Sequence, residues 1–408
     1  MTNQIDTRRY DIDWLRTLAF LLLIFYHIGQ FYVADWQWHV KSEYQSDFLK
    51  NIMLLVNQWR MPLIFLISGI ALALVEPKIS ASKLLKLRFV RIYIPLIVGM
   101  YLVVPPQLYY ELIQGSGYTG NYWEFMNFYI DINTDRYPEK HHDPVGLITW
   151  NHLWYLAYLF HYTLAYLLLK PLLTRINWAY LTQNVSLFII VFLPTSLLVI
   201  YDIALEDDFP KTHALIDDWY NHAIYFTVFL LGYILAKSKA LWDSIINHRK
   251  LWLTGACISF ILIILRFNRV GWLDGVHGEY PIWAQLSLTY LWAINKVLWL
   301  LTVVSFSGAY LNRNSKLLSY MNEAILPWYI LHQTIIIFVA MNLAKYALGG
   351  VLESTLVVIM TFIGCGIGYE IIRRFSLTRF LFGMKLLRKT VQSKLPTSKE
   401  YKTKEGLA

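Results

Sequence analysis

The first apolar segment of the chain carries two ionisable residues at a spacing that suits a helix. Arg16 and His27 are eleven residues apart, which is about three α-helical turns plus 20°, so both side chains lie on one face, roughly 16 Å apart along the axis. Histidine titrates near neutral pH and can take the proton of a hydroxyl group. The spacing therefore indicates a base deep in the segment. The alternative is that His27 only forms a hydrogen bond between helices.

Two more ionisable residues are predicted to lie at a similar depth. Counted along their own apolar segments, His27 and His332 are each about 12 to 13 residues, or roughly 20 Å, from one end, while Arg60 is roughly 14 Å from the opposite end. In a hydrocarbon core about 30 Å thick, all three fall in the outer half. A buried arginine beside two histidines could polarise a carbonyl or stabilise an oxyanion. Arg60 could instead pair with an acidic residue as part of the structure.

A basic sequence, KLLKLRFVRIYIP, begins at Lys83. Arg88 and Arg91 are three residues apart and are therefore neighbours on a helix. The forked guanidinium group binds phosphates through paired hydrogen bonds, so one hypothesis is a phosphate site. The other is that the cluster only retains its loop on the inner side of a membrane.

The composition sets the class of protein. The chain has 408 residues, of which 57% are hydrophobic and 15% are charged, whereas soluble domains carry about a quarter of their residues as charges. Many apolar segments of roughly 20 residues match the thickness of a bilayer, which excludes a water-soluble fold. They also exclude an outer-membrane barrel, because its strands run only about 10 residues and alternate between apolar and polar side chains. The net charge of +9 does not indicate a nucleic-acid partner, because the basic residues are sorted by side of the membrane.

We predict an all-α bundle of about ten transmembrane helices with both termini cytoplasmic, because Lys and Arg concentrate in the segments assigned to the inner side. The domain boundaries are a cytoplasmic N-terminal segment (1–13), a transmembrane domain (14–372) and a basic cytoplasmic tail (373–408). The predicted spans are 14–34, 51–75, 91–111, 152–170, 185–203, 221–236, 251–268, 283–307, 320–342 and 351–372.

These motifs together resemble the acyltransferase 3 family. DWLR followed by Arg16-x10-His27, and Arg88-x2-Arg91 before an Ile-Pro step, are similar to the two signature motifs of that family. The resemblance extends over nearly the whole chain through WHVKSE, RMPLIFLISG, RFVRIYIP, HLWYL and ILPWYILH, and is strongest to members that modify periplasmic glucans. One departure is that such members have paired histidines where this chain reads His332-Gln333.

The resemblance implies a membrane O-acyltransferase of the cytoplasmic membrane. It would move an acyl group (succinyl or acetyl) from cytoplasmic acyl-CoA to a hydroxyl of an extracytoplasmic glycan. The candidate catalytic residues are His27, Asp13, Arg60 and His332. The candidate residues for binding the acyl-CoA donor are Arg16, Arg88 and Arg91, and no metal or permanently bound cofactor is expected. The sequence leaves the oligomeric state open.

A different class of protein also fits part of this pattern. A transporter or flippase of glycans or lipids would have a similar number of spans, and its binding site would also lie near the middle of the membrane. No inverted repeat and no pair of interrupted helices is evident in the sequence, which favours the enzyme. Release of free CoA from acyl-CoA would discriminate the two classes.

Overall fold

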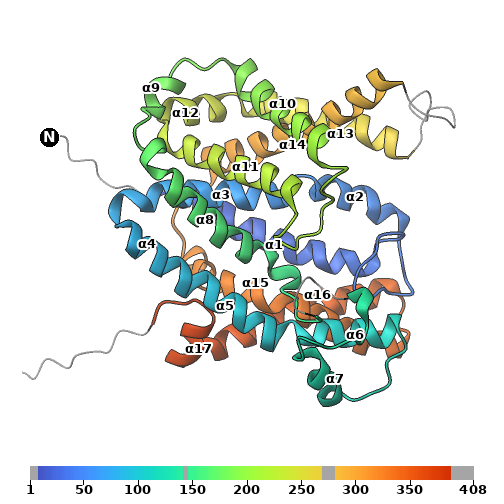
Figure 1. Cartoon of the computed structure of the whole chain (residues 1–408). Coiled ribbons are helices and arrows are strands. Elements are labelled where there is room, and N and C mark those ends of the chain that lie inside the picture. Colours follow the sequence, from blue (N-terminus) through green and yellow to red (C-terminus); the bar gives the residue numbers. More distant parts are fainter. Residues whose placement is uncertain (1–7, 141–145, 269–280, 387–408) are drawn as a thin grey trace, which may run out of the picture.

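The computed structural model of the chain describes residues 8–140, 146–268 and 281–386, and these residues form a bundle of helices (Figure 1). Within these ranges the only β-type pairing is one isolated bridge between Val33 and Ser46. Most of the predicted basic tail, from residue 387 onward, and the first seven residues of the N-terminal segment lie outside the described ranges.

The first half of the chain supplies four of the long apolar segments and the loop that follows the third of them. Its helices are α1 (Tyr10–Tyr32), α2 (Asp47–Asn57), α3 (Arg60–Val75), α4 (Ala81–Arg88), α5 (Ile94–Val98), α6 (Pro105–Gly115), α7 (Tyr122–Tyr129) and α8 (Trp154–Leu173). The helices of the second half are α9 (Trp178–Thr182), α10 (Leu187–Leu205), α11 (Trp219–Lys237), α12 (Lys239–Asn247), α13 (Arg249–Phe267), α14 (Ile282–Tyr310), α15 (Lys316–Leu343), α16 (Gly350–Ile372) and α17 (Ser376–Leu381).

The prediction of about ten spans agrees with the helices in the described ranges. Nine helical segments there are long and apolar enough to cross a membrane, and a tenth results if α11 and α12, which meet at 101°, form one span. The start of α1 and the short helix α17 lie at the same end of the bundle (Figure 1), as an even number of spans requires. Which side of the membrane this end faces stays a prediction.

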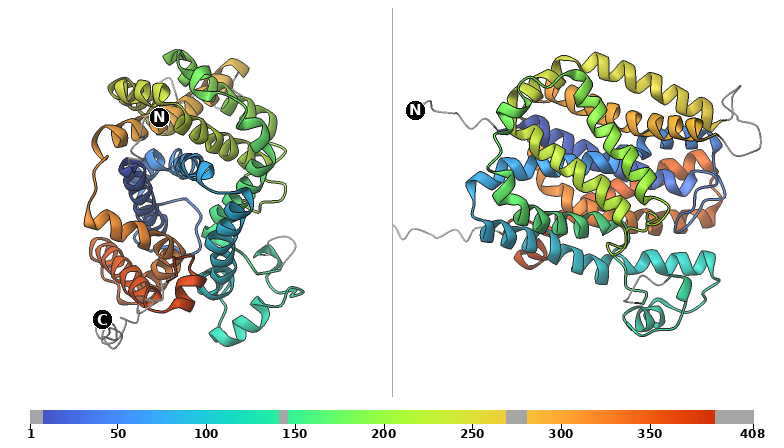
Figure 2. Two further views of the ribbon diagram at one scale, coloured as in Figure 1. Left: turned by 90° about the vertical axis from the view of Figure 1, so that its left-hand side faces the viewer. Right: turned by 45° about the horizontal axis from the view of Figure 1, so that its top comes forward.

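Helix α1 carries three of the seven candidate residues, Asp13, Arg16 and His27. It contacts α3 and α14 as well as α15 and α16, and the left view of Figure 2 shows it between these two groups of helices. Its buried side chains come from several sides of the helix, among them Leu15, Leu23 and Phe31, whereas Leu18 and Phe25, two turns apart, are exposed.

Two glycines bring α3 and α11 into close contact. A Cβ atom at Gly69 would lie 1.8 Å from the carbonyl oxygen of Phe229, and one at Gly232 would lie 2.1 Å from that of Leu66. Only residues without a side chain permit this approach, which is how membrane helices commonly pack. The contact fixes α3, whose first residue is Arg60, against α11.

The third apolar segment, from α4 to α6, is interrupted twice by π-helical turns. These turns span Phe89–Tyr93 and Gly99–Val103, and a proline follows each of them, at Pro95 and Pro105. Proline has no N–H group to continue the helical hydrogen-bond ladder, which accounts for the local change of winding. The first π turn begins directly after Arg88 and contains Arg91, and such turns are frequent at functional sites.

Candidate active site

The structure brings His27 of α1 and His332 of α15 into direct contact. The Nδ1 atom of His27 lies 2.9 Å from the Nε2 atom of His332, and the two ring centroids are 5.0 Å apart. His332 is fully buried, whereas His27 is partly exposed and lines a cavity. The similar depth predicted from helix rise is therefore consistent with a contact between the two side chains.

Hydrogen bonding determines which nitrogen of each ring carries the proton. The Nδ1 atom of His332 lies 2.7 Å from the carbonyl oxygen of Tyr329, which can only accept a hydrogen bond. When His332 is neutral, its Nε2 atom therefore has a free lone pair and accepts from His27 Nδ1–H. Consequently a neutral His27 has its lone pair on Nε2, for which the described residues provide no hydrogen-bond donor. This is the arrangement that a general base requires.

Arg60 lies beside these histidines, at the break between α2 and α3. Its guanidinium carbon is 3.5 Å from the centre of the Tyr26 ring, and Tyr26 is the neighbour of His27 in the chain. One Arg60 nitrogen donates to the side-chain oxygen of Asn57 at 2.5 Å and to its carbonyl oxygen at 3.0 Å. Within the described residues Arg60 has no acidic partner, and its buried Nε atom has no hydrogen bond. The charge is thus available to a ligand rather than taken up by an ion pair.

A third histidine, His152, belongs to the same cluster and was not among the predicted site residues. Its ring centroid is 5.1 Å from that of His332. Its Nε2 atom donates to the carbonyl oxygen of Ile330 at 3.1 Å, and its Nδ1 atom accepts from Gln107 at 3.2 Å. The sequence HLWYL, quoted above for the family resemblance, contains His152 and was the signal that could have identified it.

Gln333, at the position where the family resemblance implies a second histidine, joins a network of side-chain hydrogen bonds. Its side-chain nitrogen donates to the Gln107 oxygen at 2.9 Å and to the Asn151 oxygen at 3.3 Å. Gln107 in turn contacts His152. Gln333 therefore supports the position of His152 on the far side of the pair.

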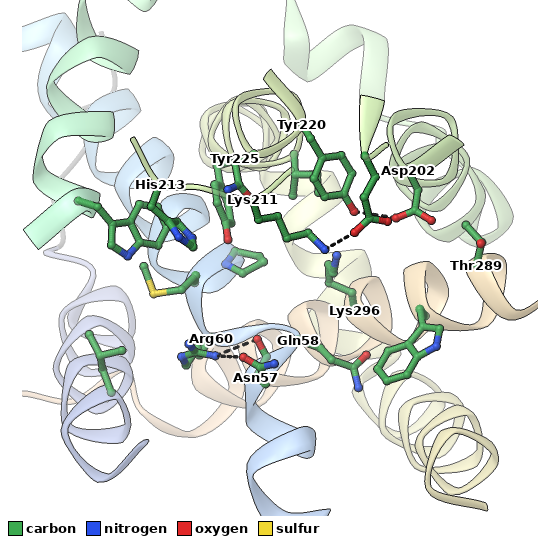
Figure 3. Close-up of a pocket in the computed structure, with 18 of the residues that line it drawn as sticks. Asn57, Gln58, Arg60, Asp202, Lys211, His213, Tyr220, Tyr225, Thr289 and Lys296 are labelled. Atoms are coloured by element: carbon green, nitrogen blue, oxygen red, sulfur yellow. Dashed lines mark hydrogen bonds and ion pairs between the residues drawn. The ribbon is translucent and has the colours of Figure 1, made fainter. Parts of the chain in front are cut away.

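The cluster lies at one end of a cavity of about 590 Å³, within the range of about 300–1,000 Å³ typical of ligand sites. His27, Arg60 and His152 line one part of this cavity, and the end of α10, the loop after it, α11 and α14 line the other part. Figure 3 shows Arg60 across the cavity from Tyr220 and Asp202. The second part includes Asp202, Glu206, Lys211, His213, Tyr220 and Lys296, so the cavity is polar and carries charges of both signs.

His213 lies on the loop between α10 and α11 and forms part of the cavity wall. Its ring centroid is 4.3 Å from that of Trp154. Burial lowers the pKa of His213 to about 4; the positive charges of Arg60 and Lys211 act in the same direction, and Asp218 opposes them. His213 is therefore uncharged at neutral pH and provides an aromatic surface.

Asp13 and Arg16 lie at the other end of α1 from His27. Arg16 forms an ion pair with Asp13 at 3.2 Å and donates to the side-chain oxygen of Asn322 at 2.6 Å. Asp13 also pairs with Arg8 at 2.7 Å. Because Asp13 is fourteen residues from His27, roughly 21 Å along the helix, the structure does not bring it to the histidine pair. Its position suits the placement of Arg16 rather than proton transfer at His27.

Arg88 and Arg91 lie together at the first π turn, and neither guanidinium has a hydrogen bond or ion pair to the described residues. The Nε atom of Arg88 is buried without a partner. Arg88 and Arg16 both lie within electrostatic range of the Tyr155 hydroxyl. Arg91 lies within electrostatic range of Arg88, so all three predicted donor-binding residues lie in one region of the bundle.

A layer of aromatic rings separates the two groups of residues. Phe20 lies on α1 between Arg16 and His27, and its ring centroid is 5.2 Å from that of Tyr329 and 6.1 Å from that of Tyr155. The Tyr155 and Tyr329 rings are 6.0 Å apart, and the Tyr155 hydroxyl hydrogen-bonds Ser68 at 2.6 Å. Tyr155 lies within electrostatic range of Arg16 and Arg88, and the Tyr329 ring is 5.9 Å from that of His332, so these rings lie between the two groups.

The fold and the site define a multi-pass membrane protein with an acid–base centre next to a buried polar cavity. The acyltransferase domain family matches residues 9–370, so the chain belongs to this family and is an acyltransferase. The match covers the histidine pair and both arginine motifs, and it confirms the resemblance carried by Arg16-x10-His27 and Arg88-x2-Arg91.

Among curated proteins, the chain is similar to glucans biosynthesis protein C from several strains of Escherichia coli. It is 24% identical to the protein of strain O139:H28 over 406 residues, which is 95% of this chain and 98% of the relative. The identity to the proteins of strains K12 and O1:K1 is also 24%, over 407 residues and with the same coverage of both chains. No solved structure gives a significant match to the chain.

Proposed function

We propose that this protein transfers an acyl group from cytoplasmic acyl-CoA to a hydroxyl group of an extracytoplasmic glycan, and that the glycan is a periplasmic glucan. The observation that carries the proposal is the hydrogen-bonded pair of His27 and His332, which leaves the His27 Nε2 lone pair without a protein partner beside a cavity. Membership of the acyltransferase family and the names of the similar glucan biosynthesis proteins support the reaction and the acceptor class.

In the proposed reaction, His27 acts as the general base. Its Nε2 atom takes the proton of the acceptor hydroxyl, and the hydroxyl oxygen attacks the thioester carbonyl carbon of the donor. The C–S bond then breaks, the ester forms, and the CoA thiolate takes the proton back from His27. His332 accepts the His27 Nδ1–H bond throughout, so it keeps the ring oriented and stabilises the positive charge that develops on it.

Arg60 is placed to stabilise the negative charge that develops on the carbonyl oxygen. A preorganised cation in a site that excludes water lowers the energy of such an intermediate far more than it would in bulk water. Its contacts with Asn57 and the Tyr26 ring hold the guanidinium group beside the histidine pair without neutralising it. No acyl-enzyme nucleophile is needed, so direct transfer is the mechanism that we propose.

Arg88 and Arg91 are proposed to bind the phosphates of the donor. Both guanidinium groups lack an acidic partner in the described residues, and the forked geometry of arginine suits phosphate oxygens. The acyl-pantetheine arm would then extend past Phe20, Tyr155 and Tyr329 toward His27. These three rings have to separate for the thioester to reach the base.

The test is an assay of free CoA with purified protein in lipid nanodiscs. Acetyl-CoA, succinyl-CoA and butyryl-CoA are each incubated with and without a neutral glucan, and free thiol and acylated glucan are measured. We expect glucan-dependent CoA release with equal formation of glucan ester. Movement of glucan across vesicle membranes without CoA release would support the alternative of a transporter and contradict the proposal.

A further inference from the structure

The outer part of the cavity contains a lysine that the proposed reaction does not use. Lys296 lies on α14 and lines the same cavity as His27 and Arg60. Leu288 and Trp292, which lie about two turns and one turn before Lys296 on the same helix, also line it. This face of α14 is therefore turned toward the cavity. A lysine inside a membrane-spanning helix is costly and indicates a functional role.

The acidic groups near Lys296 already have other partners. The Glu206 carboxylate pairs with Lys211 at 2.5 Å, and Asp202 accepts a hydrogen bond from the Tyr220 hydroxyl at 2.7 Å. Lys296 lies within electrostatic range of Asp202, Glu206 and Lys211, but it forms no hydrogen bond or ion pair with any described residue.

The balance of charge in the cavity favours an anion. Its lining contains three basic side chains, Arg60, Lys211 and Lys296, and two carboxylates, those of Asp202 and Glu206. The ammonium ends of Lys211 and Lys296 are directed to the same part of the cavity (Figure 3). Because Lys211 is engaged with Glu206, Lys296 is the ammonium group there that can donate its hydrogen bonds to a ligand.

We propose that Lys296 binds a carboxylate group of the substrate at the outer end of the cavity and selects for substrates that carry one. This inference rests on the proposed acyl transfer and adds a specificity determinant to it. The carboxylate has two possible sources: the free end of a dicarboxylic acyl group whose other end is transferred at His27, or an acidic substituent on the acceptor glycan. Both would form the same charge-assisted hydrogen bond.

The test measures binding without turnover, so its result does not depend on the acyl-transfer assay. Protein in nanodiscs is titrated with monomethyl succinate and its neutral counterpart methyl butyrate, and separately with methyl glucuronide and methyl glucoside, by ligand-observed NMR. We expect at least one carboxylate to bind about tenfold or more tightly than its neutral counterpart, as loss of a charged hydrogen bond implies. Preference for the succinate or for the glucuronide identifies the source.

The variants assign the preference to Lys296. Lys296→Met and Lys296→Gln remove the charge, and we expect both to lose the preference for the carboxylate, whereas Lys296→Arg should retain it. Lys345→Met is the control, because Lys345 follows α15 and does not line the cavity. Thermal melting verifies that each variant is folded. The proposal is overturned if the wild-type protein prefers neither carboxylate, or if a folded neutral variant keeps the full preference.

Discussion

The Nε2 atom of His332 lies 2.9 Å from the Nδ1 atom of His27, although the two residues are 305 positions apart in the chain. The His332 Nδ1 atom donates to the carbonyl oxygen of Tyr329, so the backbone of α15 sets the orientation of the His332 ring. Four testable consequences for the proposed reaction follow from this pair and from the arginines on the other side of the aromatic layer.

Substitution of His332 should lower kcat more than it raises KM, because its role is to position His27 rather than to bind substrate. We expect His332→Phe to reduce kcat by about 10²-fold or more, the scale of general-base effects. His332→Gln should retain more activity, since its side-chain oxygen can still accept the His27 Nδ1–H bond. Steady-state kinetics over a range of pH would measure both. Equal losses in the two variants would count against the positioning role.

Substitution of His27 should abolish transfer and leave the fold intact. In His27→Ala the acceptor hydroxyl has no base, and the expected loss of kcat is about 10³-fold or greater. His27→Gln keeps a polar side chain of similar size and should be as inactive, because an amide cannot take up the proton. CoA release and the melting temperature are measured together. Near-normal acylation by either well-folded variant would refute the catalytic role.

Loss of the arginine pair should weaken donor binding more than acceptor binding. We expect Arg88→Ala and Arg91→Ala each to raise the KM for acyl-CoA by about tenfold or more, since charged hydrogen bonds contribute about 1.5–3 kcal/mol. The KM for glucan should change little. Arg313→Ala is a matched control, because Arg313 lies on the exposed connection between α14 and α15. If calorimetric titration gave an unchanged affinity of the double variant for acyl-CoA, the basic cluster would serve only to keep its loop on the inner side of the membrane.

Stability should depend on pH through His213. Its pKa is about 4 in the folded protein, against an ordinary value of 6.5, so between these values the unfolded state binds more protons than the folded state. The contribution of neutral His213 to the free energy of unfolding is therefore complete above pH 6.5 and is lost as the pH falls toward 4. At about 1.4 kcal/mol for each pKa unit this contribution to the free energy of unfolding is at most about 3.5 kcal/mol, and partial exposure of the ring reduces it.

The measurement for His213 is the melting temperature of detergent-purified protein between pH 4 and 7.5. We expect His213→Gln to show a smaller decrease on acidification than the wild-type protein. Parallel curves for the two proteins would mean that His213 does not become charged on unfolding in this range.

The reaction should be vectorial, with the donor used only from the side of the basic motifs and the acceptor only from the opposite side. Arg16 and Arg88 lie on one side of the Phe20 layer and His27 on the other, and an extended phosphopantetheine arm is on the order of 20 Å, close to the separation given by helix rise. Oriented vesicles with acyl-CoA sealed on one side and an impermeant glucan on the other would test this. If product formed only when both substrates were on the same side, the prediction would be contradicted.

The sequence by itself determined the class of fold and the positions along each helix. Apolar segments of spanning length fix an all-helical bundle because a backbone in lipid must satisfy its own hydrogen bonds, and the eleven-residue spacing placed Arg16 and His27 on one face. Helix rise also placed His27, Arg60 and His332 at one depth. These features depend on local geometry, which the order of residues encodes directly.

Only the tertiary structure decided which side chains meet. Contact between α1 and α15 joins His27 to His332, and the same packing brings His152 into the cluster and leaves Asp13 at the far end of α1. Lys296 became a candidate because α14 turns one face toward the cavity. Depth along a helix follows from its sequence, but the direction in which a helix faces depends on how all of its neighbours pack, and no single segment contains that information.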